Sequence, residues 1–150
     1  MNRTALTTHN DFQWWLMDMD DALERFLAIL PPQVKKKLDF SPSSLSTLEA
    51  WILDKYPNTP AMLESDQSRL VDGVARYIGE TFRKSLGGRW DIQLDDPKFV
   101  YFGVPILTGF EEKPTPICPL TLATASADRR TGKYLRTILE NIRNLLSNPS

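Results

Sequence analysis

Few residues in this chain are of the types that carry catalytic chemistry. The sequence contains one histidine, His9, and one cysteine, Cys118. A serine or cysteine nucleophile usually relies on a histidine base that a third group orients, and zinc sites need several histidine or cysteine ligands. The chain also lacks a Walker loop and a GxGxxG motif. These observations argue against nucleophilic hydrolysis and against a zinc or nucleotide site, and we expect no cofactor.

The acidic pairs have simpler structural explanations. Asp95-Asp96 directly precedes Pro97, which is typical of a turn, and Glu111-Glu112 lies in a polar loop. The acidic stretch at residues 17–21 would point its carboxylates in different directions on a helix, and it lacks the loop of a calcium site. Cys118, beside a proline in an apolar setting, is typical of a small core residue. We therefore expect no metal site.

Glu80 is the remaining candidate for function, in the segment ARYIGETFRKSLGGRWDI at residues 75–92. A helical wheel places it beside Arg76 and Lys84, away from the apolar stripe of the same helix. Both cations lie four residues away, the spacing of surface ion pairs that stabilise a helix by a few tenths of a kcal/mol. We favour this surface pairing. The alternative is a carboxylate at the rim of a groove formed with Tyr77, Arg89 and Trp90.

Gly79 lies on the opposite, buried face of this helix. A glycine inside a helix costs ~1 kcal/mol relative to alanine, so a close approach by a strand or by the ring of Trp90 should offset that cost. This interpretation predicts that Gly79→Leu unfolds the protein while Glu80→Gln barely changes its stability. Gly87-Gly88 should end the helix in the left-handed conformation.

The hydrophobic periodicity predicts an α+β fold: N-terminal helices, one long central helix, a small antiparallel sheet and a C-terminal helix. We expect helices over residues 9–30, 32–38, 42–56, 65–86 and 133–146, with residues 57–60 as a loop. Extended runs are expected at residues 90–94 and 98–107. Residues 115–118 favour a short strand, and residues 119–129, ambiguous between strand and helix, favour helical turns. All 150 residues fit one domain.

The composition is that of an ordinary soluble protein, with 41% hydrophobic and 25% charged residues. The net charge of −1 gives no field that would gather nucleic acid. The longest purely apolar run, residues 26–30, is far shorter than the ~20 residues that span a bilayer. The N-terminus does not resemble a signal peptide, and a lone cysteine is compatible with a reducing compartment. We expect a cytoplasmic protein that binds neither membranes nor nucleic acid.

The first helix carries two large apolar side chains on its polar face. Thr8 and Asp11 have the spacing of a capping box, and the helix then buries one regular apolar stripe. Trp14 and Met17 instead share the face of Asp21 and Glu24. Such a pair needs another surface to cover it, so Trp14 and Met17 are candidate protein-binding residues. In the alternative, Trp14 packs against the C-terminal segment of this chain or against a second copy.

Four segments in order carry a family resemblance across residues 40–140: SPSSLSTLEAWIL, VDGVARYIGETFRKSLGGRW, FGVPIL and CPLTLATA–DRRTG–YL. They resemble a group of small uncharacterised bacterial α+β domains with a YxGE…GGxW…P pattern, some of them similar to immunity-type, toxin-neutralising proteins. The shared residues are mainly structural, so the resemblance implies a fold and no catalytic residues. The N-terminal acidic helix lies outside the pattern.

Two function classes follow. The first is a non-enzymatic, bacterial-type interaction protein that binds another protein, in a toxin-neutralising or regulatory role. The second is a small-molecule-binding module or histidine-independent enzyme with Tyr77, Glu80 and Arg89 in its groove. A raised pKa of Glu80 in a concave, partly apolar pocket would favour the second, and a flat surface around a solvated Glu80 the first. Self-association through Trp14 is a third alternative.

Overall fold

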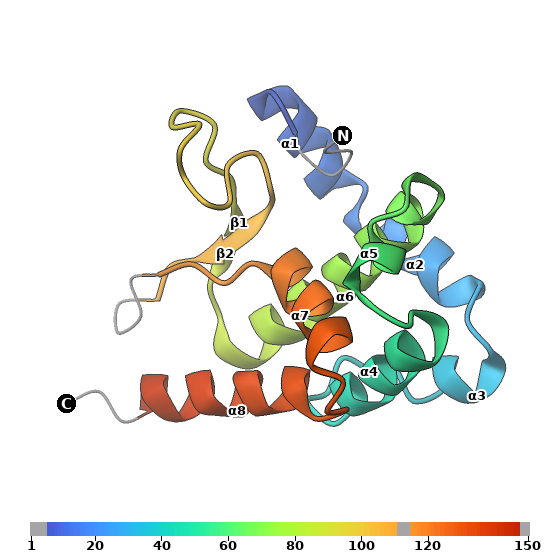
Figure 1. Cartoon of the computed structure of the whole chain (residues 1–150). Helices are drawn as coiled ribbons and strands as arrows, with labels where there is room; N and C mark the ends of the chain where they lie inside the picture. Colours follow the sequence, from blue (N-terminus) through green and yellow to red (C-terminus); the bar gives the residue numbers. More distant parts are fainter. Residues whose placement is uncertain (1–5, 111–114, 148–150) are drawn as a thin grey trace.

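The computed structural model of the chain describes residues 6–110 and 115–147 and confirms the α+β prediction (Figure 1). Within these residues the fold is mostly helical, with one two-stranded sheet. The elements in chain order are α1 (His9–Met17), α2 (Met19–Ala28), α3 (Pro32–Lys35), α4 (Ser44–Lys55), α5 (Thr59–Met62), the 3-10 helix η1 (Ser65–Gln67), α6 (Ser68–Leu86), β1 (Arg89–Asp91), β2 (Ile106–Thr108), α7 (Pro119–Arg129) and α8 (Tyr134–Ser147).

The long helix α6 is the centre of the molecule. Helices α2, α7 and α8 and strand β2 all contact it, and α7 lies across it in Figure 1. Every residue from Val71 to Phe82 is buried except Asp72, which is half-buried. A helix covered on several sides has almost no solvent face, so the amphipathic wheel describes only part of its environment.

The N-terminal segment forms two helices instead of the predicted single helix over residues 9–30. Asp18 leaves the helical conformation, with φ −83° and ψ 1°, between α1 and α2. The predicted capping box is present: the Thr8 hydroxyl accepts from the Asp11 backbone N–H, and the Asp11 carboxylate accepts from the Thr8 N–H. On either side of this break, Trp15 of α1 packs against Trp90 of β1, and α2 packs against α6; Figure 1 shows α1 at the top of the molecule.

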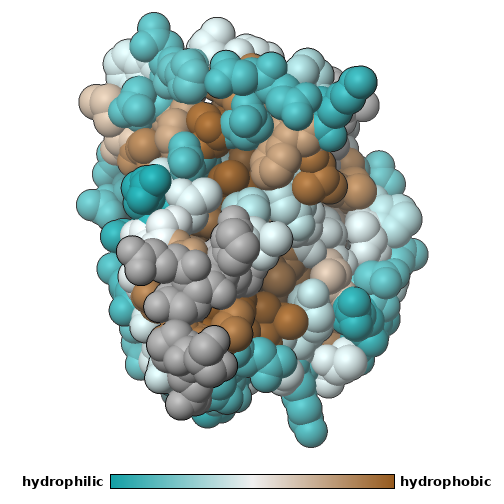
Figure 2. All heavy atoms as spheres, turned by 90° about the vertical axis from the view of Figure 1, so that its left-hand side faces the viewer, coloured by the Kyte–Doolittle hydropathy of each residue, from teal (hydrophilic) through white to brown (hydrophobic). Residues whose placement is uncertain are grey.

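The sheet is shorter than predicted. Strands β1 and β2 pair antiparallel with Trp90 opposite Leu107, and Leu107 also bridges to Ile117. The prediction of extended backbone at residues 98–104 is wrong, because successive four-residue turns form there. In these turns the backbone N–H groups of Phe99, Phe102 and Val104 donate to the carbonyls of Asp96, Phe99 and Tyr101. This loop projects on the left of Figure 1, and Val100 on it is 79% exposed. Figure 2 shows that side of the molecule, where hydrophobic residues surface among hydrophilic ones.

Most other boundaries agree with the sequence prediction. Gly87 and Gly88 end α6 with φ of 86° and 85°, and residues 119–129 form helix α7. Helix α4 begins at Ser44 and not at Pro42, and its predicted stripe, Leu45, Leu48, Ile52 and Tyr56, is buried. The predicted loop at residues 57–60 is partly wrong, since α5 begins at Thr59 with Asn58 as its cap.

A buried carboxylate joins α4 to α8. Glu49 is fully buried, and its oxygens accept hydrogen bonds from the backbone N–H groups of Tyr134 at 3.0 Å and Leu135 at 2.8 Å. These N–H groups belong to the first turn of α8 and have no partner within the helix. The positive end of the helix dipole favours the carboxylate at that place.

Candidate functional site: the groove beside α1

Helix α1 presents Trp14 and Met17 to solvent. Trp14 is 69% exposed and Met17 is 73% exposed, as the helical wheel predicts. The alternative in which Trp14 packs against the C-terminal helix does not hold, because α8 lies at the opposite end of the molecule (Figure 1). Since the two side chains are three residues apart on one helix, they form a continuous apolar surface.

Two hollows adjoin this pair. A groove of about 370 Å³ runs between the α1–α2 junction, α6 and β1. It is lined by Leu16, Met17, Met19, Asp20, Glu80, Arg83, Arg89 and Trp90. A second hollow of about 420 Å³ is lined by Trp14, Met17 and Asp18. Met17 lines both, so its side chain stands between the two hollows.

The neighbouring Trp15 faces inward and anchors α1. Its ring stacks on Phe12, with centroids 6.2 Å apart, and meets the edge of Trp90 at 4.8 Å. Its indole N–H donates to Asp72 at 2.9 Å. The Arg76 guanidinium lies 4.1 Å from the ring centroid, a cation–π contact. Trp14 and Met17 are therefore carried on a helix that is fixed from its other face.

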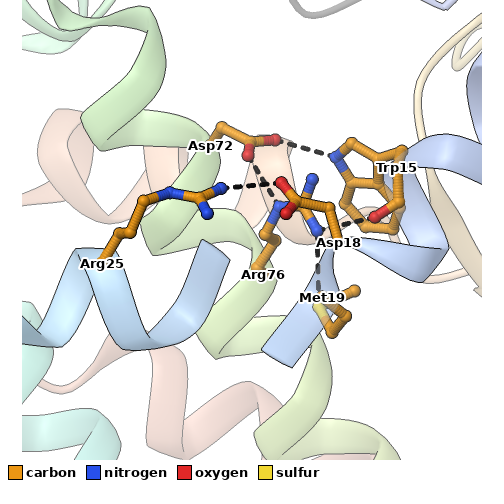
Figure 3. A network of polar contacts seen from close by, with 6 residues as sticks. All are labelled: Trp15, Asp18, Met19, Arg25, Asp72 and Arg76. Atoms are coloured by element: carbon orange, nitrogen blue, oxygen red, sulfur yellow. Dashed lines mark hydrogen bonds and ion pairs between the residues drawn. The ribbon is translucent and has the colours of Figure 1, made fainter. Parts of the chain in front are cut away.

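Arg76 is the charged centre of this anchor (Figure 3). It is 3% exposed, and its Nε donates to Asp72 at 2.7 Å. Its Nη1 donates to the backbone carbonyl of Trp15 at 2.8 Å and contacts the sulfur of Met19 at 3.8 Å. A buried guanidinium needs such a full set of partners. The network joins α6 to both sides of the break at Asp18.

Glu80 is buried, which corrects the prediction of a surface pair with Arg76 and Lys84. It is 6% exposed. Arg83 donates Nε and Nη2 to its two oxygens at 2.9 and 3.2 Å, and the Trp90 indole N–H donates at 2.8 Å. The helical wheel placed Glu80 on a free face, but the side chains of Trp90 and Arg83 cover its carboxylate. Arg76 is engaged by Asp72 instead.

The hydrogen bonds to Glu80 decide its ionisation. Burial raises the pKa of the carboxyl, but the hydrogen bonds from Arg83 and Trp90, together with the charges of Arg83 and Lys84, outweigh burial and hold the pKa below its ordinary value. A carboxylate kept ionised and fully bonded is a poor general acid or base. Glu80 positions Trp90 in the wall of the groove.

The predicted ligand residues do not form one cluster. Glu80 and Arg89 line the groove together with Met17, but Tyr77 lies elsewhere. Tyr77 is fully buried, its hydroxyl accepts from the Phe40 N–H at 2.9 Å and bonds to the Ser44 hydroxyl at 2.8 Å, and burial raises its pKa. Placing Tyr77 in the groove was wrong, because α6 turns it toward α4.

Gly79 behaves as the sequence predicts. A Cβ at this position would overlap the ring of Trp90 and come within 3.1 Å of Pro119. The bare backbone of α6 lets the indole lie flat enough for its N–H to reach Glu80.

The sequence did not predict that Trp15, Arg76 and Asp72 form one network, although the i,i+4 spacing of Asp72 and Arg76 indicated that those two could pair.

The residues best suited to catalysis are not assembled. His9 is exposed at the start of α1, and Cys118 is buried, with burial raising the pKa of its thiol. Residues 6–110 and 115–147 contain no cluster of three or more histidine, cysteine or acidic side chains that could hold a metal ion. In the same part of the chain, no helix combines the length and apolar character that crossing a bilayer requires.

Comparison with known proteins adds no further assignment. No family model, curated protein or solved structure matches the chain.

Proposed function

We propose that this chain is a non-enzymatic interaction protein that binds another protein through the Trp14–Met17 surface, in a toxin-neutralising or regulatory role. The observation that carries the proposal is the exposure of these two side chains, 69% and 73%, on a helix fixed by Trp15. Tryptophan is enriched among the residues that dominate binding energy. An anchor held in place before binding loses less conformational freedom on association.

The charge around this surface indicates the chemistry of the partner. Helices α1 and α2 with their junction carry five carboxylates, Asp11, Asp18, Asp20, Asp21 and Glu24, against the single cation Arg25. Arg25 pairs with Asp18 at 2.7 Å, while Asp20, Asp21 and Glu24 are exposed. A partner with an apolar anchor flanked by lysine or arginine would match this surface.

The geometry does not favour a small-molecule site on Glu80. The groove is concave and partly apolar, as that alternative requires, but the pKa of Glu80 is lowered and its oxygens are engaged by Arg83 and Trp90. A ligand that bound this carboxylate would have to break those hydrogen bonds. In the proposed complex the groove accommodates a side chain of the partner protein.

The test is capture of a partner from an extract of the source cells by the immobilised chain, with identification by mass spectrometry. We expect a stoichiometric protein partner that the Trp14→Ser/Met17→Ser double variant binds at least tenfold more weakly. Val100→Ser is the matched control, since Val100 is equally exposed but lies on the loop between β1 and β2. Equal binding by the double variant, or no partner at all, would refute the proposal.

A further inference from the structure

A second, larger hollow lies on another side of α2, away from the Trp14–Met17 surface. It has a volume of about 550 Å³ and is formed by α2, the end of α4, η1 and the first turns of α6. This volume falls within the range of small-molecule sites. Neither Trp14, Met17 nor Glu80 lines it, so it is independent of the proposed protein-binding surface.

Small side chains create the hollow. Ala22, Ala28 and Gly73 line it together with Phe26 and Leu70. Gly73 is required for the packing beneath: a Cβ there would lie 2.6 Å from Cδ1 of Phe26. The ring of Phe26 therefore rests on bare backbone and forms a firm apolar floor. Ile29, 65% exposed, extends the apolar surface to the rim.

Some of the charged groups at the rim already have an ion-pair partner among the residues that the structure describes, and others do not. Three cations, Arg25, Lys55 and Arg69, and two carboxylates, Asp66 and Asp72, line the hollow. Both oxygens of Asp72 are engaged, one by Trp15 and the other by Arg76. Arg25 pairs with Asp18. Lys55 and Arg69 have no ion pair within residues 6–110 and 115–147, although Lys55 also lies 5.6 Å from the Tyr56 ring.

We propose that this hollow binds a small amphipathic anion, with an apolar body against Phe26 and Leu70 and an acidic group facing Lys55 and Arg69. The apolar floor supplies the favourable burial. Of the two lining carboxylates, only Asp66 has no ion pair within residues 6–110 and 115–147, so the two cations outnumber it and select negative charge. A guanidinium and an ammonium suit a carboxylate, sulfonate or phosphate. The hollow is large enough for a fused aromatic system or a medium acyl chain.

The experiment uses two fluorescent probes of similar size with the intact chain. The first, 1-anilinonaphthalene-8-sulfonate, is anionic, and the second, N-phenyl-1-naphthylamine, is neutral. We expect saturable binding of one molecule of the anionic probe. Arg69→Gln and Lys55→Gln should each raise its Kd about threefold, as for other partly exposed ion pairs, and leave the Kd of the neutral probe unchanged. Arg136→Gln on α8 is the charge-matched control.

A second pair of variants tests the location. Ala28→Gln adds volume to the hollow at an exposed position and should weaken both probes, while Ala50→Gln, at an exposed position on α4, should not. Circular dichroism establishes that each variant is folded. The proposal fails if binding is not saturable, if Arg69→Gln acts no more strongly than Arg136→Gln, if it weakens both probes equally, or if Ala28→Gln changes neither Kd.

Discussion

At the scale of single residues, the contact between Gly79 and Trp90 determines the shape of the groove wall. Trp90 lies over the bare backbone of Gly79, meets Trp15 edge-on and donates its N–H to Glu80. The three residues depend on one another, because without the space at Gly79 the Trp90 ring could not reach the carboxylate of Glu80. The packing of Trp90 on α6 thus explains why Gly79, Glu80 and Trp90 occur together in the segment at residues 75–92.

Gly79→Ala should destabilise the protein by about 1–3 kcal/mol, the range for overpacking a filled site. The methyl group would gain helix propensity but overlap the Trp90 ring. In a Trp90→Ala background the same substitution should cost much less, because the overlapping atoms are gone. Urea denaturation of the four proteins in this cycle measures the difference, and equal costs in the two backgrounds would contradict the assigned contact.

Glu80→Gln should destabilise the protein by about 2 kcal/mol, the scale of hydrogen bonds to a charged group, where a surface pair would predict almost no change. The folded pKa of Glu80 is lowered from 4.5, so its contribution is present above that pH and is lost as pH falls through the folded pKa. The stability difference between wild type and Glu80→Gln should therefore shrink from pH 6 to pH 3. A stability difference that stays constant between pH 6 and pH 3 would contradict a lowered pKa of Glu80 in the folded protein.

At the scale of elements, the attachment of α1 depends on Trp15 and Arg76. The buried Phe12 also holds this helix, and the Leu6 N–H just before it donates to the Gly103 carbonyl. Because the guanidinium of Arg76 bonds to both sides of the break at Asp18, the position of Trp14 and Met17 depends on a side chain of α6.

Arg76→Met should free α1 without unfolding the rest of the molecule. It leaves one Asp72 oxygen and the Trp15 carbonyl without their donor, and losing a hydrogen bond to a charged group costs about 1.5–3 kcal/mol. We expect backbone amides of residues 9–17 to exchange hydrogen much faster, while those of α6 and α8 change little. Arg136→Met, which removes the exposed pair with Glu140, is the control, and protected α1 amides in Arg76→Met would contradict this role.

Helix periodicity predicted α4, α6 and α8 because each buries one regular apolar stripe. It could not predict the burial of Glu80, since that depends on β1 folding back so that Trp90 lies over α6 and bonds to the carboxylate. Nor could it place the break at Asp18, where every residue suits a helix. The aromatic run at residues 98–104 suggested a strand from its composition, but local turns satisfy its backbone. The exposed pair on α1 needed no tertiary information.

At the scale of the whole molecule, the uneven charge bears on self-association. Helices α1 and α2 with their junction carry five carboxylates and one cation, so two copies that met symmetrically through these helices would bring like charges together. We therefore expect the purified protein to have the mass of one chain, 17.1 kDa, by light scattering. A dimer that Trp14→Ser converts to a monomer would show that this surface binds a second copy.

The hydrogen bonds of the buried Glu49 also join two distant parts of the chain. Its partners, Tyr134 and Leu135, follow it by 85 and 86 residues in the chain, and contacts of such separation close late and slow the folding rate. During synthesis the carboxylate of α4 must remain hydrated until the start of α8 has left the ribosome. Helix α4 therefore remains incompletely packed until α8 has been synthesised.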